Sequence, residues 1–278
     1  MSNRTGARLV LVNRARWAGG GDYMMSRFGQ AEGETVSEIE DYEKIADAYE
    51  ESMGLPFRDA VEQYTLMGIL GDVTGVKAVD MACGDGFYAR LLKRAGASDV
   101  LGIDVSAEMI RRAEEAERRN PLGCTYRQAE VVGLELAEPA DVVVGMYLLG
   151  YARNAEQLRG FCKAGHDALR PGGRFVGVND DVRNPGSGDW KQYGLERTGP
   201  TSPAEGDGVR YRITNSDGGR FDLQNFYLSP QTYQAAFREA GFSDFSWVDV
   251  SLQPSERGNP FWDEFMRRSP IVGFVATR

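Results

Sequence analysis

Two glycines and three aspartates are the residues whose types and spacing best predict chemistry in this sequence. Asp80, Gly84, Asp85 and Gly86 lie in the stretch VDMACGDGFYARLL (79–92), and Asp104 closes the later stretch LGID. Glycines let the backbone approach a ligand closely, and the N-terminus of a following helix directs free N–H groups into the same crevice. Acidic residues in this loop favour a ligand with cationic groups. An acidic residue at the end of the second strand can accept hydrogen bonds from both hydroxyls of a ribose. The pattern therefore predicts a site for a cationic, ribose-bearing ligand.

The same loop has an alternative interpretation as a dinucleotide site. Gly84, Gly86 and Ala89 loosely fit the pattern GxGxxA, which cradles a pyrophosphate. Asp80 and Asp85 would repel that anion, and a glycine pattern on its own is weak evidence. We therefore favour the cationic ligand.

Alternating strands and helices must position this loop. Apolar runs predict strands at 77–83, 99–104, 124–128, 141–148 and 174–179, and amphipathic patterns predict helices at 86–94, 106–119 and 154–169. Ser106 and Asn154 are expected to cap the second and third helices. Strands this apolar, separated by helices, require a parallel sheet covered on both faces and joined by right-handed crossovers. Ligands of such sheets bind beyond the carboxyl ends of the strands.

Different patterns precede and follow this core. Residues 1–35 are Gly-rich without sustained periodicity, and we expect a flexible extension there rather than a lid. Residues 36–72 have helical periodicity and are expected to form a cap. Residues 181–228 are expected to form loops and a hairpin around NSDGG, inserted over the active site. A helix capped by Ser229 follows, before two last strands. We interpret residues 36–278 as one domain.

Composition restricts the class of partner. The 278 residues include 32 Lys and Arg against 41 Asp and Glu, and the net charge of −9 argues against a nucleic acid as the main partner. Cys83, Cys124 and Cys162 are widely spaced, fit no metal site and indicate a reducing compartment. No apolar run reaches the roughly 18 residues of a membrane span. We expect a cytoplasmic protein without a metal or membrane partner, and a homodimer stays open.

Four motifs together resemble one enzyme family. DMACGDG, GIDVSAEM, QAEV and LRPGGRF follow the order and spacing of class I S-adenosylmethionine (SAM)-dependent methyltransferases. The stretches DYEKIADAY, MYLLGYA and NFYLSPQTY are similar to the toxoflavin synthase-like group, whose members modify small molecules. The resemblance implies a Rossmann-like α/β fold, with a mostly parallel sheet of seven strands, the last of them antiparallel, a helical N-terminal cap and a β-hairpin insertion after strand five.

The resemblance also implies positions around SAM, which would leave as S-adenosylhomocysteine. Those around the methionine moiety, or folding over it, are Tyr42, Tyr49, Arg58, Asp80, Ala82, Gly84, Gly86, Tyr88 and Met146. Those around the ribose and adenine are Asp104, Val105, Met109, Ala129, Glu130 and Val131. Arg58 would pair with the carboxylate of SAM, and Glu130 stands where the family often has Asp. Core packing is the alternative role for Tyr42 and Tyr49, and a solvated surface charge for Arg58.

The acceptor side is predicted from the ends of the later strands. Tyr147, Tyr151 and Asn179 are the expected catalytic residues, with Tyr147 and Asn179 orienting the acceptor. Methyl transfer is an in-line displacement at an activated carbon, so alignment and desolvation suffice and a strong base is optional. His166, the only histidine, lies before strand five and is not expected to be catalytic. MYLLGY stands where (D/N)PP(Y/F) would follow strand four, which disfavours amino-methylation of nucleic acids or of protein glutamine.

These observations predict SAM-dependent methylation of a small-molecule acceptor at N, O or C, in specialised metabolism. Two alternatives stay open because fold and cofactor do not fix chemistry. One is an enzyme that cyclises SAM to azetidine-2-carboxylate and methylthioadenosine. The other is a regulatory protein that binds SAM without turnover.

Overall fold

A computed structural model of the chain describes residues 45–186 and 188–278. Its centre is a seven-stranded sheet in the order β3-β2-β1-β4-β5-β10-β9. The strands are β1 (Lys77–Met81), β2 (Asp99–Asp104), β3 (Cys124–Gln128), β4 (Ala140–Val144), β5 (Leu169–Asp180), β9 (Asp244–Val248) and β10 (Ile271–Thr277). Pairing is parallel from β3 to β5, and β10 runs antiparallel to both of its neighbours. The predicted sheet, mostly parallel with an antiparallel last strand, is confirmed.

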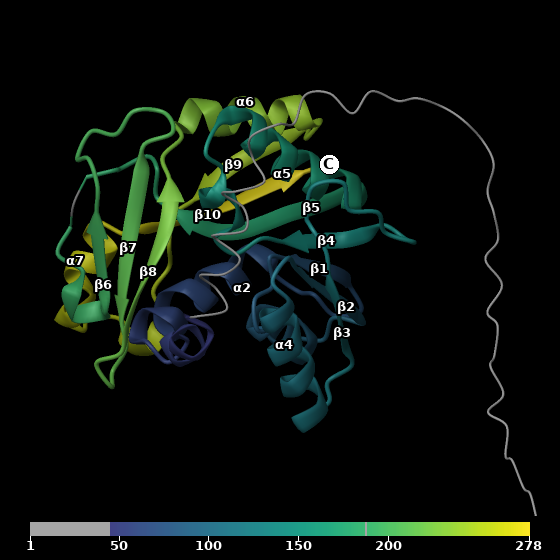
Figure 1. Ribbon diagram of the computed structural model, residues 1–278, viewed down its shortest axis with the longest axis horizontal. Helices are drawn as coiled ribbons and strands as arrows, with labels where there is room; N and C mark the ends of the chain where they lie inside the picture. The colour runs from purple at the N-terminus through teal and green to yellow at the C-terminus, as the bar shows by residue number, and fades with distance from the viewer. Residues whose placement is uncertain (1–44, 187) are drawn as a thin grey trace, which may run out of the picture.

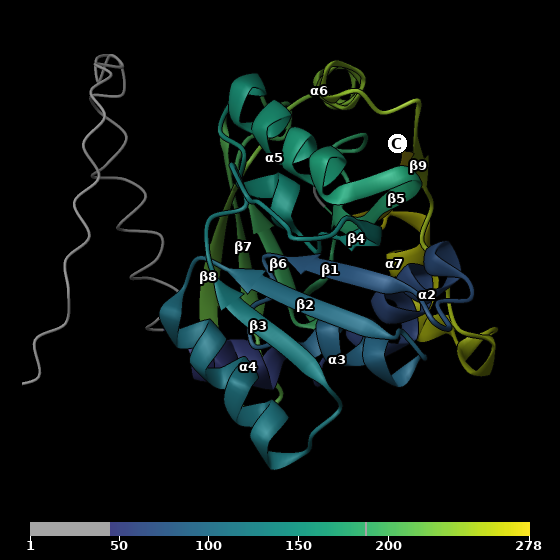
Figure 2. The same ribbon diagram turned by 90° about the vertical axis from the view of Figure 1, so that its right-hand side faces the viewer.

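Helices cover both faces of this sheet. They are α2 (Tyr64–Leu70), α3 (Phe87–Arg94), α4 (Ala107–Arg119), α5 (Ala155–Ala168), α6 (Pro230–Ala240) and α7 (Asp263–Arg267). Figure 2 shows α5 and α6 on one side of the strands and α3 and α4 on the other. Each face has its own hydrophobic cluster, one built with α2 and α3 and the other with α5 and α6. The sheet is therefore buried on both faces, as parallel sheets generally are.

Side-chain caps fix where three of these helices begin. The Ser106 hydroxyl accepts a hydrogen bond from the Met109 amide at 3.3 Å. The carboxamide of Asn154 and the hydroxyl of Ser229 accept equivalent bonds, at 3.0 and 3.2 Å, at the starts of α5 and α6. The predicted caps are confirmed. They satisfy amides that the first turn of a helix otherwise leaves without partners.

Three strands differ from their predicted bounds, and the first of them, β1, ends at Met81 rather than at 83. β4 ends at Val144, whereas the apolar run predicted a strand to residue 148. Tyr147 adopts a left-handed backbone conformation (φ 58°), and the short 3₁₀-helix η2 (Leu148–Tyr151) follows it. β5 begins at Leu169, the last residue of the helix predicted at 154–169, rather than at 174, because Leu169 pairs with Ala140.

A second, three-stranded antiparallel sheet stands apart from the main one (Figure 1). It consists of β6 (Leu195–Thr198), β7 (Gly208–Thr214) and β8 (Arg220–Phe226). The predicted hairpin around NSDGG is confirmed by the β7–β8 pairing, whereas β6 was not predicted. The arrowheads of β1, β2 and β3 in Figure 2 point toward this second sheet. The carboxyl ends of the parallel strands therefore face it.

The remaining segments are short or lie at the edge of the described chain. Residues 45–52 are helical, and a π-helix, η1 (Arg58–Gln63), precedes α2. Short 3₁₀-helices complete the fold: η3 (Lys191–Tyr193), η4 (Pro254–Glu256) and η5 (Pro260–Trp262). The extension expected at 1–35, and residues 36–44 of the expected cap with Tyr42, lie outside the described residues. Within the described part, none of the helices has the length and apolar character needed to cross a membrane.

Candidate active site

A cavity lies between the carboxyl ends of the parallel strands and the second sheet. Many residues predicted for the site line it together: Tyr49, Arg58, Ala82, Gly84, Asp104, Val105, Glu130, Val131, Met146, Tyr147 and Tyr151. They come from segments that precede β1 or follow β1, β2, β3 and β4. The fold thus gathers residues far apart in sequence at one place, where ligands of open α/β sheets bind.

Asp104 ties two of these segments together at the end of β2. One carboxylate oxygen accepts a hydrogen bond from the Gly84 amide at 2.8 Å, and the other accepts one from the Ser106 amide at 2.9 Å. Burial raises the pKa of Asp104, and these backbone amides act in the opposite direction. Each oxygen keeps a further lone pair for a ligand. Asp104 therefore fixes the glycine loop and still offers an acceptor to the cavity.

Apolar side chains exposed at the cavity favour an apolar group beside Asp104. Val105 and Val132 are 39% and 51% exposed, and both line the cavity. With Tyr64 they are the exposed large hydrophobic residues among those described. Large apolar surface left open at a concave site generally marks a place that a ligand covers.

Backbone strain is concentrated at the same cavity. Ala82 and Tyr147 are the non-glycine residues of the described chain with positive φ, 58° in each case. They follow β1 and β4, and both line the cavity. Such conformations persist where surrounding structure enforces them, and they cluster at ligand and active sites.

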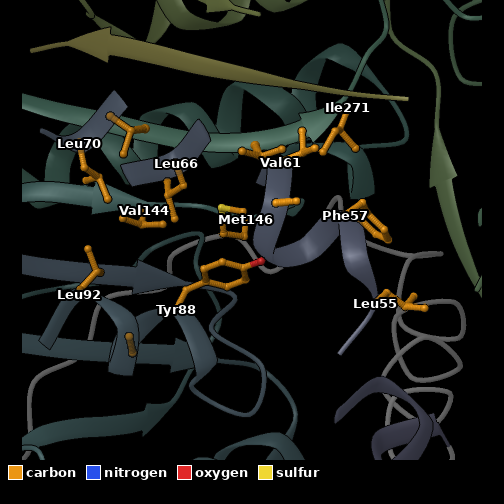
Figure 3. Packing of buried hydrophobic residues seen from close by; sticks show 14 of the residues in the cluster. Leu55, Phe57, Val61, Leu66, Leu70, Tyr88, Leu92, Val144, Met146 and Ile271 are labelled. Carbon is orange, nitrogen blue, oxygen red and sulfur yellow. The ribbon is translucent and has the colours of Figure 1, made fainter. Parts of the chain in front are cut away.

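Glu62 is a central residue of the site that sequence reasoning missed. It is completely buried in η1, and its carboxylate lies 2.7 Å from Arg58 Nη1. The hydroxyls of Tyr88 and Tyr147 both donate hydrogen bonds to it. Figure 3 shows the Tyr88 ring within the buried cluster, its hydroxyl directed toward the helical segment that carries Val61. The four side chains form one buried polar network behind the cavity.

This network corrects one interpretation of Arg58. A solvated surface charge was the alternative role, but Arg58 is only 3% exposed and lines the cavity. Its Nε has no hydrogen-bond partner among the described residues. The pairing of Arg58 with Glu62, four residues on in FRDAVEQ, was the signal available in the sequence.

Several predicted residues lie outside the cavity lining. They are Asp80, Gly86, Tyr88, Met109, Ala129 and Asn179. Gly86 has φ 82°, and a Cβ there would lie 2.6 Å from the Tyr126 hydroxyl. The glycine is thus required by packing against Tyr126, so its position gives no separate evidence for a ligand. Met109 is a core residue of α4, 1% exposed.

Asn179 does not take the position expected of it. Its carboxamide accepts a hydrogen bond from the Gly150 amide and donates one to the Tyr233 hydroxyl, each at 3.1 Å. The side chain is fully buried, on the α6 side of the sheet. Because successive residues of a strand point to opposite faces, the neighbouring Asp180 lines the cavity instead.

Asp80 lies beneath the glycine loop rather than in the cavity. It is 1% exposed, and neither carboxylate oxygen has a hydrogen bond of normal geometry from a described residue. Burial raises the pKa of Asp80 to about 8, the Ala89 amide lowers it, and the charges of Asp104 and Asp85 raise it. A cation close to Asp80 would therefore favour the ionised carboxylate and lower its pKa.

The far end of the cavity is formed by residues that sequence reasoning did not select. Its lining there includes Asp180, Leu195, Tyr211, Ile213, Leu223, Asn225 and Ile271. Tyr211 and Ile213 are two residues apart in β7, as are Leu223 and Asn225 in β8. Each pair therefore lies on one face of the second sheet. The cavity thus has an end near Asp104 and a largely apolar end at the second sheet.

The comparisons with known proteins agree with this geometry. Residues 78–173, from β1 into β5, match the protein family described as Methyltransferase domain. This match covers 96 of the 278 residues. The matched residues include the glycine loop, Asp104 and the segment after β4, so the family match covers the end of the cavity near Asp104.

Curated relatives resemble only part of the chain. The ubiquinone biosynthesis O-methyltransferase of Methylococcus capsulatus is 36% identical over 103 residues, which cover 36% of this chain and 42% of that protein. The enzyme with the same description from Bradyrhizobium is 28% identical over 130 residues, 47% of each chain. The match spans less than half the length of these curated relatives.

Solved structures share the fold over most of the chain. A SAM-dependent methyltransferase from Mesorhizobium loti has a TM-score of 0.58 at 22% identity and covers 82% of this chain and 100% of its own. The methyltransferase CcbJ from Streptomyces caelestis has a TM-score of 0.59 at 17% identity, covering 86% and 97%. The sugar N-methyltransferase KedS8 from Streptoalloteichus has a TM-score of 0.56 at 17% identity, covering 95% and 99%. The fold is that of class I methyltransferases.

Proposed function

We propose that the chain transfers a methyl group from SAM to a small-molecule acceptor. The observation that carries this proposal is one continuous cavity with two different ends. The end near Asp104 and Val105 suits a ribose and a base, and the end at the second sheet has a different, largely apolar lining that suits a second molecule. An enzyme that consumed SAM alone would not need that second end.

The residues present fit SAM in charge and shape. Asp104 would accept the ribose hydroxyls, and Val105 and Val131 would cover the adenine. The backbone at Ala82 and Gly84 would approach the methionine moiety, where a Cβ on Gly84 would meet only Tyr49, at 3.6 Å. The free Nε of Arg58 provides a donor toward a carboxylate. When bound, SAM supplies a methyl group that its positive sulfur has already activated.

Alignment and exclusion of water are the main contributions we assign to the protein. Met146 and Tyr147 lie where β4 ends, between the two ends of the cavity, and the Glu62 network fixes the Tyr147 ring. Tyr151 and Tyr211 line the cavity on the acceptor side. Holding the acceptor in line with the methyl carbon in such a site lowers the barrier by positioning and desolvation.

The acceptor belongs, in this proposal, to specialised metabolism. Support comes from KedS8, which is named as a sugar N-methyltransferase and shares the fold over nearly the whole chain. The ubiquinone biosynthesis enzymes are likewise named for a small molecule. The cytoplasmic location, the homodimer and the absence of a nucleic-acid partner remain predictions from the sequence.

Mass spectrometry tests the proposed function directly. Purified protein is incubated with SAM alone and then with SAM and a panel of small amines, phenols and sugars. S-adenosylhomocysteine that forms only with an acceptor supports methyl transfer. Methylthioadenosine formed from SAM alone would contradict methyl transfer and favour the cyclisation reaction. SAM binding without either product would favour the regulatory role. The variant Asp104→Ala is the matched control, because it should lower turnover with every acceptor.

A further inference from the structure

Asp180 and Asn225 form a buried polar pair at the acceptor end of the cavity. Asp180 is the last residue of β5 and Asn225 lies in β8, so the pair joins the main sheet to the second sheet. The Asn225 Nδ2 donates a hydrogen bond to Asp180 Oδ2. Asp180 is 9% exposed and Asn225 is 4% exposed, and both line the cavity.

Because Gly150 has no side chain, it leaves space for the Asp180–Asn225 pair. A Cβ on Gly150 would lie 2.9 Å from Asn225 Nδ2 and 3.2 Å from Asp180 Oδ2. The Gly150 amide is held by Asn179. The backbone of η2 therefore packs directly against the pair and restricts where its atoms can move.

The pair has hydrogen-bonding capacity that the protein does not use. Asn225 Oδ1 is buried without a hydrogen-bond partner in the described structure. Within the same residues Asp180 makes no ion pair, and Arg197 is the cation that lowers its pKa from a greater distance. A buried carboxylate without an ion pair and a buried carbonyl without a donor are costly unless a ligand satisfies them.

The surroundings identify what kind of ligand could satisfy both groups. Side chains of Leu195, Ile213, Leu223 and Ile271 make the walls of this end apolar. A hydroxyl has one hydrogen to donate, whereas a positively charged ammonium group has three. An ammonium group can therefore donate hydrogen bonds to a carboxylate and a carbonyl at the same time. The negative charge without an ion pair also favours a cation.

Burial sets the proton affinity of Asp180. It raises the pKa of this carboxyl to about 6, while the hydrogen bond from Asn225 and the charge of Arg197 lower it. The other titratable groups facing Asp180 are Tyr147, Tyr211 and Tyr233, and its charge raises the pKa of each. At neutral pH the carboxylate is thus ionised and more basic than an ordinary aspartate, as a general base requires.

Building on the proposed methyl transfer, we propose that Asp180 and Asn225 bind the amino group of an apolar amine and that Asp180 is its general base. The amine enters as an ammonium ion, and Asp180 takes one of its protons. The freed nitrogen lone pair then forms a bond to the methyl carbon. The carbon–sulfur bond breaks, and its electron pair stays on sulfur, which becomes a neutral thioether.

Binding of three matched probes tests this proposal without knowledge of the natural acceptor. Benzylamine, benzyl alcohol and toluene are titrated by calorimetry into the protein saturated with S-adenosylhomocysteine at neutral pH. We expect benzylamine to bind at least tenfold more tightly than either neutral probe, and to weaken below about pH 6 as Asp180 is protonated. Equal affinity for benzylamine and benzyl alcohol, or no benzylamine binding by this complex, would overturn the proposal.

Two variants assign the effect to Asp180. Asp180→Asn should reduce benzylamine affinity at least tenfold and leave the affinity for S-adenosylhomocysteine within about twofold. Asp222→Asn, an exposed acid of β8 outside the cavity lining, should change neither. With SAM and benzylamine, Asp180→Asn should lower kcat at least about a hundredfold, with the KM for SAM unchanged. Unchanged benzylamine binding or turnover in Asp180→Asn contradicts the inference. Loss of S-adenosylhomocysteine binding by the wild type would instead contradict the proposed function.

Discussion

Arg58 and Glu62 form an ion pair of 2.7 Å inside a π-helix, with both side chains buried. π-Helical turns are rare and frequently occur at functional sites. The pair connects the segment before β1 to Tyr88 after β1 and to Tyr147 after β4 through the Glu62 carboxylate. One buried acid therefore holds three of the residues assigned to the site.

Glu62→Ala should lower the free energy of unfolding by about 3 to 5 kcal/mol. The substitution leaves the Arg58 charge buried without its partner and removes the acceptor of two tyrosine hydroxyls. Urea denaturation measures the loss. Glu115→Ala provides the comparison, because Glu115 pairs with Arg111 at the surface, where such pairs contribute about 1 kcal/mol or less. Equal losses at the two positions would contradict the network.

Asp104→Ala should weaken SAM binding at least tenfold, because charge-assisted hydrogen bonds to the ribose are lost. Asp104→Asn should have an intermediate effect, since it keeps one oxygen acceptor. Calorimetry measures both affinities. Asp99→Asn is the control, because Asp99 is exposed at the opposite end of β2. Unchanged affinity in Asp104→Ala would refute the assignment of this site.

The sequence predicted the glycine loop and Asp104 well because their signals are local. A strand, a glycine turn, a helix and a following acid all lie between 77 and 104, and each element has its own pattern. Glu62 was missed because a glutamate in a segment predicted to be helical is usually solvated, and no local pattern shows that its carboxylate is buried. Its partners Tyr88 and Tyr147 come from distant segments that only the fold brings together.

The acceptor side was less predictable for a related reason. The choice of Asn179 over Asp180 depended on the face of β5, and a one-residue shift in a strand moves a side chain to the opposite face. Asn225 belongs to a hairpin that was predicted, but the position of that hairpin against the main sheet is a tertiary property. Gly86 was assigned to the ligand although its contact is with Tyr126 of β3.

Gly84→Ala and Gly86→Ala should differ in their effects, although both glycines have positive φ. Each alanine adds backbone strain of roughly 1 to 2 kcal/mol. Gly86→Ala also places a Cβ against Tyr126, so it should destabilise the fold more, as measured by urea denaturation. Gly84→Ala should mainly weaken SAM binding, because Gly84 lines the cavity. In a double-mutant cycle, Tyr126→Ala should recover part of the Gly86→Ala loss. Strict additivity would contradict the packing role of Gly86.

Asp80→Asn should change how the stability of the protein depends on pH. The pKa of Asp80 is about 8 in the folded chain, well above the ordinary aspartate value of 3.8. Between these values the folded protein holds a proton that the unfolded chain has lost, so wild-type stability falls as pH rises through this window. The asparagine variant lacks that proton exchange.

The stability difference between Asp80→Asn and the wild type should therefore rise from about pH 4 to about pH 8. A shift of one pKa unit corresponds to about 1.4 kcal/mol, and we expect the rise to exceed this value. Any constant cost of burying the amide cancels in the comparison between pH values. Urea denaturation at several pH values measures the difference. For the control Asp99→Asn, a substitution at an exposed position of β2, the stability difference from the wild type should hardly change with pH. A flat difference for Asp80→Asn as well would mean that Asp80 is not held protonated by burial.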